Sequence, residues 1–499
     1  MRSSETFTQS LRGRLPALMI AFCVLQPALD VLGYWQLRAG LTNTVTLAAR
    51  ITLLVLLLIL GLLLSHHRRS YLVLGGVLLA YLTGHVLSCL AVNPAYDWLE
   101  DLADQTRFLF LPTATVCFVT FLREQEGGFS VLMKGLMLCF GLILLVMLLS
   151  VVTGTDPHTY EAKGIGVRGW FHWTSAQSAV LSLLCPLVLA WTLKRFPGRL
   201  LPLGLACLLS FGALFLFGTR LAYASLAASG LCMAACLMLH DRKGWPQALT
   251  ILAFTALFLC LLPVSPMTRN QEAVDENAVV KQQRIDAAVS AVSDVQDPAD
   301  PELLRAAYRY NLQSLVDRFG IEKVAEAYGN TLDAGRICDD RLRKLRFCEL
   351  LMEESAAVTP AARVFGLEIG RTRVESTEVY YFETDEWKQE PESNDPENDI
   401  LGIFYLCGWV GLILCVLFLG AFALRAAAYL RRQPRMLFDP TLAAFLIAFL
   451  IALVYACTTV SVLRRNNSSV YLAFVLAGLW HLTRRGQPGP SGSGKELPQ

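Results

Sequence analysis

The sequence has few charged residues for its length. Asp, Glu, Lys and Arg make up 17% of the 499 residues, whereas soluble domains carry roughly 25%. Stretches such as TLLVLLLILGLLL (52–64) and GLMLCFGLILLVMLL (135–149) contain no charged side chain at all, and a bilayer core needs about 20 predominantly apolar residues per helix. This scarcity of charge excludes a soluble protein and predicts an all-α polytopic membrane protein.

Motifs for nucleotide and metal chemistry are also missing. Neither GxxxxGK(S/T) nor GxGxxG occurs, and no spacing of Cys and His residues is typical of a metal site. We therefore expect no metal, no other cofactor and no nucleic-acid partner. A cleavable signal peptide is not evident, because the first apolar run, residues 15–36, is long and lacks a small-residue cleavage site.

The cysteines do not predict a disulfide framework. Twelve of the fourteen lie in apolar runs, where Cys behaves as a small apolar residue. Only Cys338 and Cys348 lie in a polar part of the chain. On a continuous helix these two residues are about 15 Å apart at 1.5 Å per residue, which is too far for a disulfide.

What the sequence does contain is a series of apolar runs long enough to cross a bilayer. Lys and Arg gather between alternate runs, as at Arg68 and Arg69 after the second run and at Lys194 and Arg195 after the sixth. Because cytoplasmic loops carry the excess of Lys and Arg, this pattern places both termini in the cytoplasm. We expect about twelve spans, near residues 15–36, 43–64, 71–92, 107–122, 131–153, 174–193, 200–217, 221–239, 247–265, 401–424, 440–460 and 468–482.

One polar segment interrupts this series between the ninth and tenth spans. It holds 28 Asp and Glu against 16 Lys and Arg, whereas the rest of the chain holds 13 acidic and 27 basic residues. Its place in the alternation predicts that it is external. The expected organisation is spans one to nine in residues 1–265, an external acidic domain in 266–400, spans ten to twelve in 401–482 and a disordered cytoplasmic tail in 483–499.

The polar segment is expected to be mainly helical. Residues 300–320 are predicted to form a helix, with Asp300 as its N-cap and Gly320 as its terminator. Residues 339–355 are predicted to form another. The stretch 383–399 is expected to be a loop, because it is too acidic and too interrupted by proline to pack well.

An arginine stands alone among apolar residues in LFLFGTRLAYASLAAS (214–229). In the predicted topology this residue, Arg220, occupies a tight external turn between spans seven and eight. A cation in this place is snorkelling, paired or available to an anion. The tight turn holds it close to the bundle, which favours a binding role over anchoring in the lipid headgroups.

Other arginines also lie on the side predicted to be external. Short external loops usually avoid arginine, so a group of them indicates an anion-binding site at the external membrane surface. The alternative is that each arginine anchors a lipid headgroup. The group consists of Arg168 in the loop before span six, Arg464 and Arg465 between spans eleven and twelve, Arg107 at the start of span four and Arg50 near the external end of span two.

The loop around Arg168 is rich in aromatic side chains, including Trp170, His172 and Trp173. These residues fit an ordinary interfacial belt and equally fit stacking against sugar rings. His172 beside two tryptophans favours a structural role.

In the polar segment, Arg341 and Lys344 share one face of their predicted helix, either for binding or as a solvated surface. Asp395, Glu397 and Asp399 stand at the entrance to span ten, at the height of Arg168 and Arg220. Carboxylates in such a place often serve only solvation.

Three stretches resemble the O-antigen ligases and Wzy-type polysaccharide polymerases. RGWFHWTSAQSAVLSLLCPLVLA (168–190) is similar to the Arg-Gly-x-Phe motif of that family, and GTRLAYASLAASG (218–230) to its Ser-Arg-Gly motif on an external turn. ENDILGIFYLCGWVGLILCVLFL (397–419) resembles the end of the large external loop, where a polar pair precedes an aromatic helix and a Gly-aliphatic-aliphatic-Gly step. A weaker similarity covers DDRLRKLRFCELLMEESAAVTPAARVFGLEIG (339–370), where an Arg-led helix leads into Phe-Gly-x-x-x-Gly.

The resemblance implies a GT-C-like fold and a glycosyltransferase in the bacterial cytoplasmic membrane. Such enzymes move a glycan from undecaprenyl diphosphate to an acceptor glycan or lipid at the outer membrane face, without a metal. Two guanidinium groups would then stabilise the diphosphate leaving group. The motif matches assign this role to Arg220 and Arg341, with Arg168 as a third, and predict that the three arginines converge on one external cavity.

The resemblance further implies a carboxylate that accepts or orients the acceptor hydroxyl, with Glu397 as first choice and Asp399 as second. Many ligases carry His-Asn where this chain carries Glu397-Asn398, a departure that favours a polymerase. Thr219 and Leu221 also replace the Ser and Gly of the motif around Arg220. The expected substrate-binding residues are Arg168, Trp170, His172, Arg464 and Arg465.

Two other classes of protein fit part of the pattern. A transporter or flippase of lipid-linked oligosaccharides usually has charges or broken helices near the bilayer midplane and internal repeats, and neither is evident in this sequence. A non-catalytic membrane scaffold would use the acidic segment to bind a partner. It would not need arginines at three separate external turns.

Overall fold

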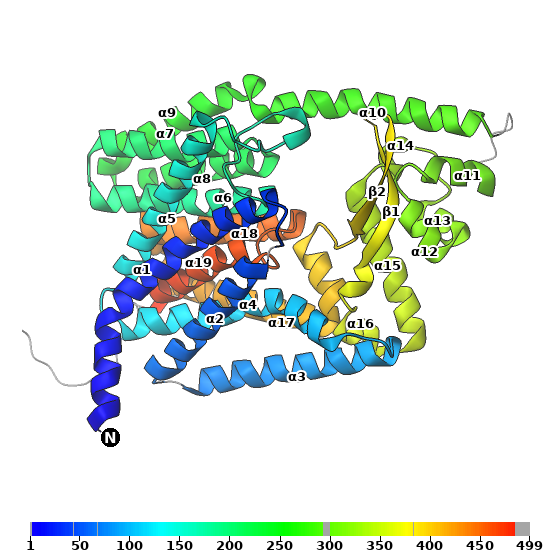
Figure 1. Ribbon diagram of the computed structural model, residues 1–499. Coiled ribbons are helices and arrows are strands. Elements are labelled where there is room, and N and C mark those ends of the chain that lie inside the picture. The colour runs from blue at the N-terminus through cyan, green and yellow to red at the C-terminus, as the bar shows by residue number, and fades with distance from the viewer. Residues whose placement is uncertain (1, 43, 67, 293–299, 383, 485–499) are drawn as a thin grey trace, which may run out of the picture.

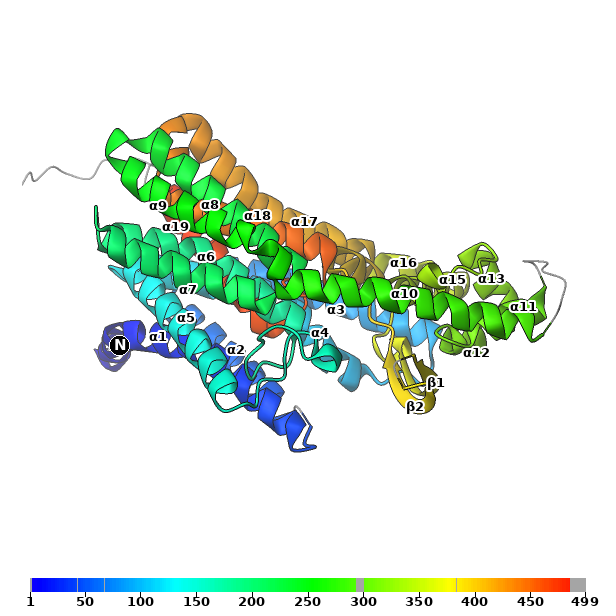
Figure 2. The ribbon, with the colours of Figure 1, turned by 90° about the horizontal axis from the view of Figure 1, so that it is seen from above.

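The structure is a computed structural model that describes residues 2–42, 44–66, 68–292, 300–382 and 384–484. Its helices form a bundle, and the polar segment lies beside one end of that bundle (Figure 1). Two long helices, α3 (Arg68–Val92) and α10 (Pro266–Ser290), run from the bundle to opposite sides of the polar segment. The view from above again shows the polar segment beside one end of the bundle (Figure 2).

Ten helices in the described residues are long and apolar enough to cross a membrane, which confirms an all-α multi-pass membrane protein. Two further helices, α9 (Trp245–Cys260) and α19 (Asn466–Arg484), occupy the positions of the ninth and twelfth predicted spans, and α9 has only 16 residues. The ten are α1 (Arg2–Arg38, with the candidate span within Ser10–Arg38), α2 (Thr44–Leu64), α3, α4 (Trp98–Glu124), α5 (Gly128–Val152), α6 (Thr174–Arg195), α7 (Leu200–Phe217), α8 (Arg220–His240), α17 (Asp399–Arg432) and α18 (Pro440–Thr458).

The centre of the bundle is formed by helices that bury almost all of their surface. Helix α6 is the most enclosed, and its small residues let α18 and α8 pack closely against it. Phe118 on α4 contacts Phe474 on α19 edge-to-face, with 4.7 Å between the ring centroids. Helices far apart in the sequence are thus joined in one core.

The polar segment has a hydrophobic core of its own. Buried side chains of its short helices, among them Leu304, Tyr308, Tyr328, Phe347 and Leu351, pack together. The helices of the polar segment are the long α10 together with α11 (Pro301–Tyr308), α12 (Gln313–Phe319), α13 (Ile321–Tyr328), α14 (Ala334–Ile337), α15 (Asp340–Val358) and α16 (Ala361–Phe365).

The predicted helix over 339–355 is confirmed as α15, capped by Asp339. The single helix predicted over 300–320 is wrong, because the chain turns between α11 and α12. The turn brings Leu312 into the same core as Tyr308, whereas a straight helix would carry the second half away from it. Asp300 does cap the first helix, and Gly320 does end the second.

The predicted loop over 383–399 is also wrong for residues 386–393. Residues Glu386–Ser393 form strand β2, which pairs antiparallel with β1 (Arg373–Tyr381). The acidic composition does not predict this strand, because its stability comes from pairing with β1. Tyr380 stands opposite Trp387, and their ring centroids lie 4.9 Å apart.

A break in α17 joins the polar segment to the bundle. Gly408 has φ 65° and ψ −170° inside this helix, a conformation that favours glycine. The backbone at Gly366 enters the break, where a Cβ atom on Gly366 would collide with Leu406, and the Leu367 N–H donates to the Tyr405 carbonyl at 2.9 Å. The glycines of two motifs singled out in the sequence therefore meet in space.

Polar side chains of α3 and α4 hold this junction. One nitrogen of the His85 ring, Nδ1, lies 2.7 Å from the Phe365 carbonyl and the other, Nε2, lies 2.8 Å from the carboxylate of Asp101. Asp101 also accepts the backbone N–H of Ile369 at 2.9 Å.

Cys338 and Cys348 are free thiols, and Cys348 is buried. Most of the predicted tail, residues 485–499, lies outside the described residues.

Candidate functional site

A polar cavity of about 460 Å³ opens at the end of the bundle that carries the polar segment. Its walls come from the end of α1, the starts of α2 and α4, the loop before α6, the loop between α18 and α19, and β1. Five arginines and a histidine face two aspartates there. The basic side chains are Arg50, Arg107, His172, Arg373, Arg464 and Arg465, and the acidic ones are Asp30 and Asp104.

Carboxylates neutralise some of these arginines. The buried Arg50 pairs with Asp30 across α1 and α2. Arg107 lies 3.1 Å from Asp395, and Arg373 lies 2.5 Å from Asp104. These pairs hold charged side chains in place at the mouth of the bundle.

Arg464 lies in the loop between α18 and α19, and its side chain is buried against the segment that leads into α17. Its guanidinium contacts Asp395 at 2.5 Å, Asp399 at 3.3 Å and the Pro396 carbonyl. Burial raises the pKa of the Asp395 carboxyl, but Arg464 and Arg107 outweigh that effect and hold it well below its usual range. Arg464 is therefore a structural cation with its charge compensated.

Asp399 completes this network and is fully buried. Its carboxylate accepts the backbone N–H groups of Ser461, Val462 and Leu463 at 3.2, 2.7 and 2.8 Å, besides Nε of Arg464. Four donors occupy the lone pairs of this carboxylate. The geometry supports a role in holding the 461–465 turn rather than in taking a proton from a substrate.

Arg465, the next residue, has the opposite environment. None of the described residues gives it a carboxylate within 4.0 Å, and its Nε atom is buried without a hydrogen-bond partner in the described part of the chain. Its guanidinium lies over the Trp173 ring, 3.7 Å from the centroid. Burial lowers the pKa of Arg465 to about 10, so the group remains a cation at neutral pH.

His172 lies beside this cation. Its ring contacts that of Trp173, with 4.4 Å between the centroids, and both line the cavity. Burial lowers the pKa of His172, and the charges of Arg168 and Arg465 lower it further. Three predicted binding residues, His172, Arg464 and Arg465, are thus brought together.

The other predicted binding residues lie behind or beside the cavity and are not among its lining residues. Arg168 is buried and bonds to Glu161 and to Thr174, both at 3.1 Å. Trp170 donates its indole N–H to Thr155 at 2.9 Å and packs edge-on against Trp35.

The motif-derived candidates Arg220, Arg341 and Glu397 do not line this cavity either. Arg220 is exposed and donates to Gln271 on α10. Arg341 and Lys344 both bond to Glu397, at 3.3 and 2.6 Å. Arg168, Arg220 and Arg341 therefore stand in three different environments, and the cavity described here contains none of the three.

Burial raises the pKa of Glu397, but the neighbouring ammonium and guanidinium groups of Lys344 and Arg341 outweigh it, so the net pKa lies below the ordinary value. Glu397 is consequently ionised at neutral pH and is a weaker base than a free glutamate.

Sequence reasoning overlooked Asp30, Asp104 and Arg373. Opposite charges in adjacent apolar spans were a signal for the pair of Asp30 and Arg50. Arg373 gave no such signal, because it reaches the cavity only through the unexpected hairpin. In the described ranges, no group of three or more His, Cys, Asp or Glu side chains is placed to hold a metal ion.

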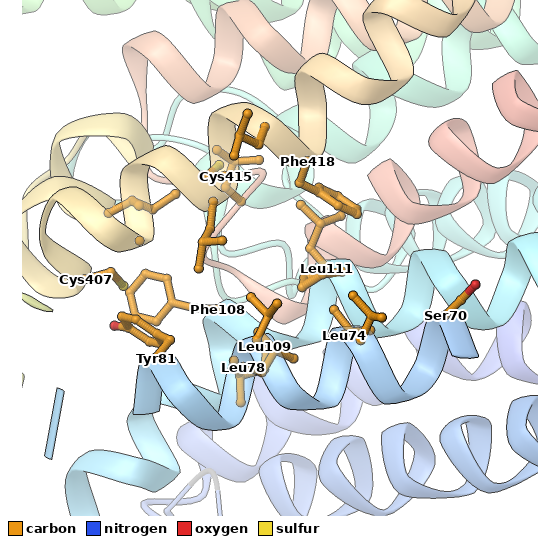
Figure 3. Close-up of a pocket in the computed structure, with 18 of the residues that line it drawn as sticks. Ser70, Leu74, Leu78, Tyr81, Phe108, Leu109, Leu111, Cys407, Cys415 and Phe418 are labelled. Carbon is orange, nitrogen blue, oxygen red and sulfur yellow. The ribbon is translucent and has the colours of Figure 1, made fainter. Parts of the chain in front are cut away.

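An apolar groove of about 640 Å³ lies between α3, α4 and α17 (Figure 3). Leu74, Leu78 and Tyr81 on α3 face Cys407, Cys415 and Phe418 on α17 across it. The groove and the polar cavity share part of a wall, because Phe108 lines the groove while the preceding residue Arg107 lines the cavity. Leu463 and Arg464 are divided in the same way.

The pKa of His172 predicts a pH effect on stability. Below pH about 6.5 an unfolded histidine takes up a proton that the folded protein disfavours at this position, so His172 makes stability fall as the pH drops. We expect the unfolding midpoint of the detergent-solubilised protein to fall less between pH 7.5 and 5.5 in His172→Gln than in the wild type. His240→Gln, at the exposed end of α8, is the matched control. Equal losses in the wild type and His172→Gln would contradict the assignment.

Comparison with known proteins gives one family. The family model described as O-antigen ligase like membrane protein matches residues 13–309, more than half of the chain. No curated protein is similar enough in sequence to match.

Proposed function

This chain belongs to the family of O-antigen ligase-like membrane proteins, and from this premise we propose that it polymerises or ligates undecaprenyl-diphosphate-linked oligosaccharides. The reaction would take place at the outer face of a bacterial cytoplasmic membrane, with both termini cytoplasmic and residues 266–400 external. The proposed acceptor is a glycan or a lipid.

The observation that carries the proposal is that the polar cavity and the apolar groove lie on two sides of shared walls. Arg107 and Arg464 line the polar cavity, and their chain neighbours Phe108 and Leu463 line the apolar groove. A lipid diphosphate has the same division between an anionic head and an apolar tail. The groove between membrane-spanning helices suits an isoprenoid chain, and the cavity suits the diphosphate.

Arg465 is the best-placed group to stabilise the leaving diphosphate. In the proposed reaction an acceptor hydroxyl oxygen bonds to the anomeric carbon, and the bond from that carbon to the diphosphate oxygen breaks. The departing diphosphate keeps the electron pair. A fixed guanidinium at the wall of the cavity offsets this charge without reorganising. The other cations lining the cavity add to the positive potential.

The proton of the acceptor hydroxyl would go to Glu397 in this scheme. Its lowered pKa makes it a weak base, so orienting the hydroxyl and accepting the proton late in the reaction suit it better than early deprotonation. Lys344 and Arg341 would hold the carboxylate in place.

Glu397→Gln tests this role. The amide keeps the shape of the side chain but cannot take the proton, so we expect kcat to fall about 10²–10⁴-fold with KM little changed. Transfer by the protein in proteoliposomes is the measurement. Glu378→Gln, at a half-buried site on β1 where the carboxylate pairs with Arg309, is the matched control. Normal kcat in Glu397→Gln would remove this residue from the reaction.

The role predicted for Arg220 from its motif stays a prediction. Lysine keeps the charge but not the planar fork of donors. If Arg220 contacts the diphosphate, Arg220→Lys should lower transfer about 10²–10³-fold. Polymer of normal length in cells carrying Arg220→Lys would indicate that Arg220 only anchors the start of α8 to Gln271.

The proposed activity itself is tested with the full chain in proteoliposomes. Lipid-linked oligosaccharide and EDTA are supplied, and free undecaprenyl diphosphate is measured. We expect its release together with a longer or transferred glycan. Movement of intact lipid-linked oligosaccharide across the bilayer without release would instead show a flippase.

A further inference from the structure

A second polar cavity, of about 410 Å³, lies in the polar segment, away from the membrane-spanning helices. It is formed by the β hairpin together with α10, α15 and the turn between α11 and α12. Its volume falls within the range of about 300–1,000 Å³ that is usual for small-molecule sites. The function proposed above does not use it.

Aromatic rings form one wall of this cavity. Tyr310 contacts Tyr380 edge-to-face and Phe382 in a stacked arrangement, with centroids 4.9 and 5.7 Å apart. Tyr380 is buried, while Tyr310 and Phe382 are half-buried and line the open space. Rings held by one another in this way present rigid faces at little entropic cost. The C–H faces of sugar rings pack against such surfaces.

The rest of the lining is polar and balanced in charge, and the ammonium of Lys281 lies 5.3 Å from the centroid of the Phe382 ring. Three basic side chains, Lys281, Arg343 and Lys344, line the cavity with three acidic ones, Asp340, Glu390 and Glu392. The cavity in the bundle, by contrast, holds five arginines against two aspartates. A charge-balanced wall does not favour a phosphate or another polyanion. It offers both donors and acceptors to a neutral molecule with many hydroxyl groups.

Arg343 is the best-fixed donor of this wall. Its side chain is nine-tenths buried, pairs with Glu392 and donates to Asn311 at 3.3 Å. Its Nε atom has no hydrogen-bond partner in the described part of the chain.

This cavity is connected to the proposed reaction site. Lys344 lines it and donates to Glu397 at 2.6 Å. Strand β2 forms part of its wall and leads directly to Asp395, which pairs with Arg464. A glycan lying here would therefore extend toward the carboxylate that we propose to act on the acceptor hydroxyl.

We propose that the cavity between the β hairpin and α15 is a subsite for neutral sugar residues of the glycan. The proposal rests on the proposed glycan transfer for its biological meaning, but binding can be measured without transfer. The sugars belong either to the lipid-linked donor or to the acceptor, and both present the same ring faces and hydroxyls.

Binding is tested with the full-length protein in detergent, on an array of neutral and of uronic-acid-containing oligosaccharides. We expect retention on neutral members and at least tenfold weaker retention of Tyr310→Ala. Tyr310→Phe keeps the ring and should bind as the wild type does. Trp245→Ala, at the exposed start of α9, is the matched aromatic control. Because Tyr310→Ala can disturb the hairpin, Phe382→Ala is measured in parallel, with the unfolding midpoint of each variant.

Failure of the wild type to bind any neutral oligosaccharide would overturn the subsite, as would preference for acidic members or wild-type binding by both well-folded alanine variants. Arg465→Ala separates this result from the proposed function, since it should lose transfer and keep oligosaccharide binding. In the transfer assay, Tyr310→Ala should raise the KM of one substrate, which identifies the sugars as those of the donor or of the acceptor.

Discussion

Replacing Arg465 with alanine is expected to lower glycan transfer about 10²–10³-fold while leaving the protein folded. The loss follows from the environment of this side chain, which lines the cavity with no carboxylate within 4.0 Å among the described residues and rests on the Trp173 ring. A guanidinium fixed at the wall of the cavity is a strong donor to developing phosphate charge. Removing it breaks no ion pair among the described residues, so folding should be retained.

Arg465→Lys refines the same experiment. Lysine supplies a point charge, cannot donate two parallel hydrogen bonds and stacks less well on an indole, so most of the loss should remain. Transfer in proteoliposomes and the unfolding midpoint in detergent are the two measurements. Arg242→Ala, at an exposed site just after α8, is the matched control and should behave as the wild type does. Full transfer by Arg465→Ala would show that the diphosphate lies elsewhere, and the Arg220 variant would then be the next one to measure.

Asp399→Asn is expected to destabilise the protein by about 3–5 kcal/mol, as removal of one partner from a buried ion pair does. The carboxylate is fully buried and holds three backbone N–H groups as well as Arg464. An asparagine offers one oxygen to these four donors, and its amide N–H groups face other donors. The charge of Arg464 also loses part of its compensation.

The effect should appear as poor accumulation in the membrane and a lowered unfolding midpoint in detergent. Two matched controls are available. Asp317→Asn changes an exposed carboxylate and should have little effect. Glu397→Gln should slow transfer and lower the midpoint less than Asp399→Asn does, because Glu397 is partly exposed whereas Asp399 is fully buried. An Asp399→Asn protein that unfolds like the wild type but cannot transfer glycan would show a direct role in the reaction.

Some features of this protein follow from single stretches of its sequence, whereas others depend on tertiary contacts. Membrane-spanning helices follow from composition over a single stretch, because each helix satisfies its own backbone hydrogen bonds and an apolar run is stable in lipid. Helix ends in the polar segment follow in the same way from caps such as Asp300 and Asp339. The glycines of the motif around Gly408 were visible as well, although the close approach of Gly366 that explains them was not.

The hairpin could not be predicted in this way. Strand β2 is acidic and contains proline, and it is stable only because β1 and the rings of Tyr310 and Tyr380 lie against it. A helix carries its hydrogen bonds within one stretch, whereas a strand needs a partner that composition does not reveal. Arg373 and the cavity in the polar segment were missed for the same reason.

The sequence by itself determined that arginines would gather at one end of a membrane bundle, since their spacing relative to the apolar runs is enough to place them. Only the tertiary structure decided which of them is available to an anion. Arg464 and Arg465 are adjacent and chemically identical, yet the first is enclosed by Asp395 and Asp399 and the second faces the cavity beside Trp173. The strength of a charge in a protein depends on the carboxylates and the solvent around it, and residues more than sixty positions away supply those carboxylates.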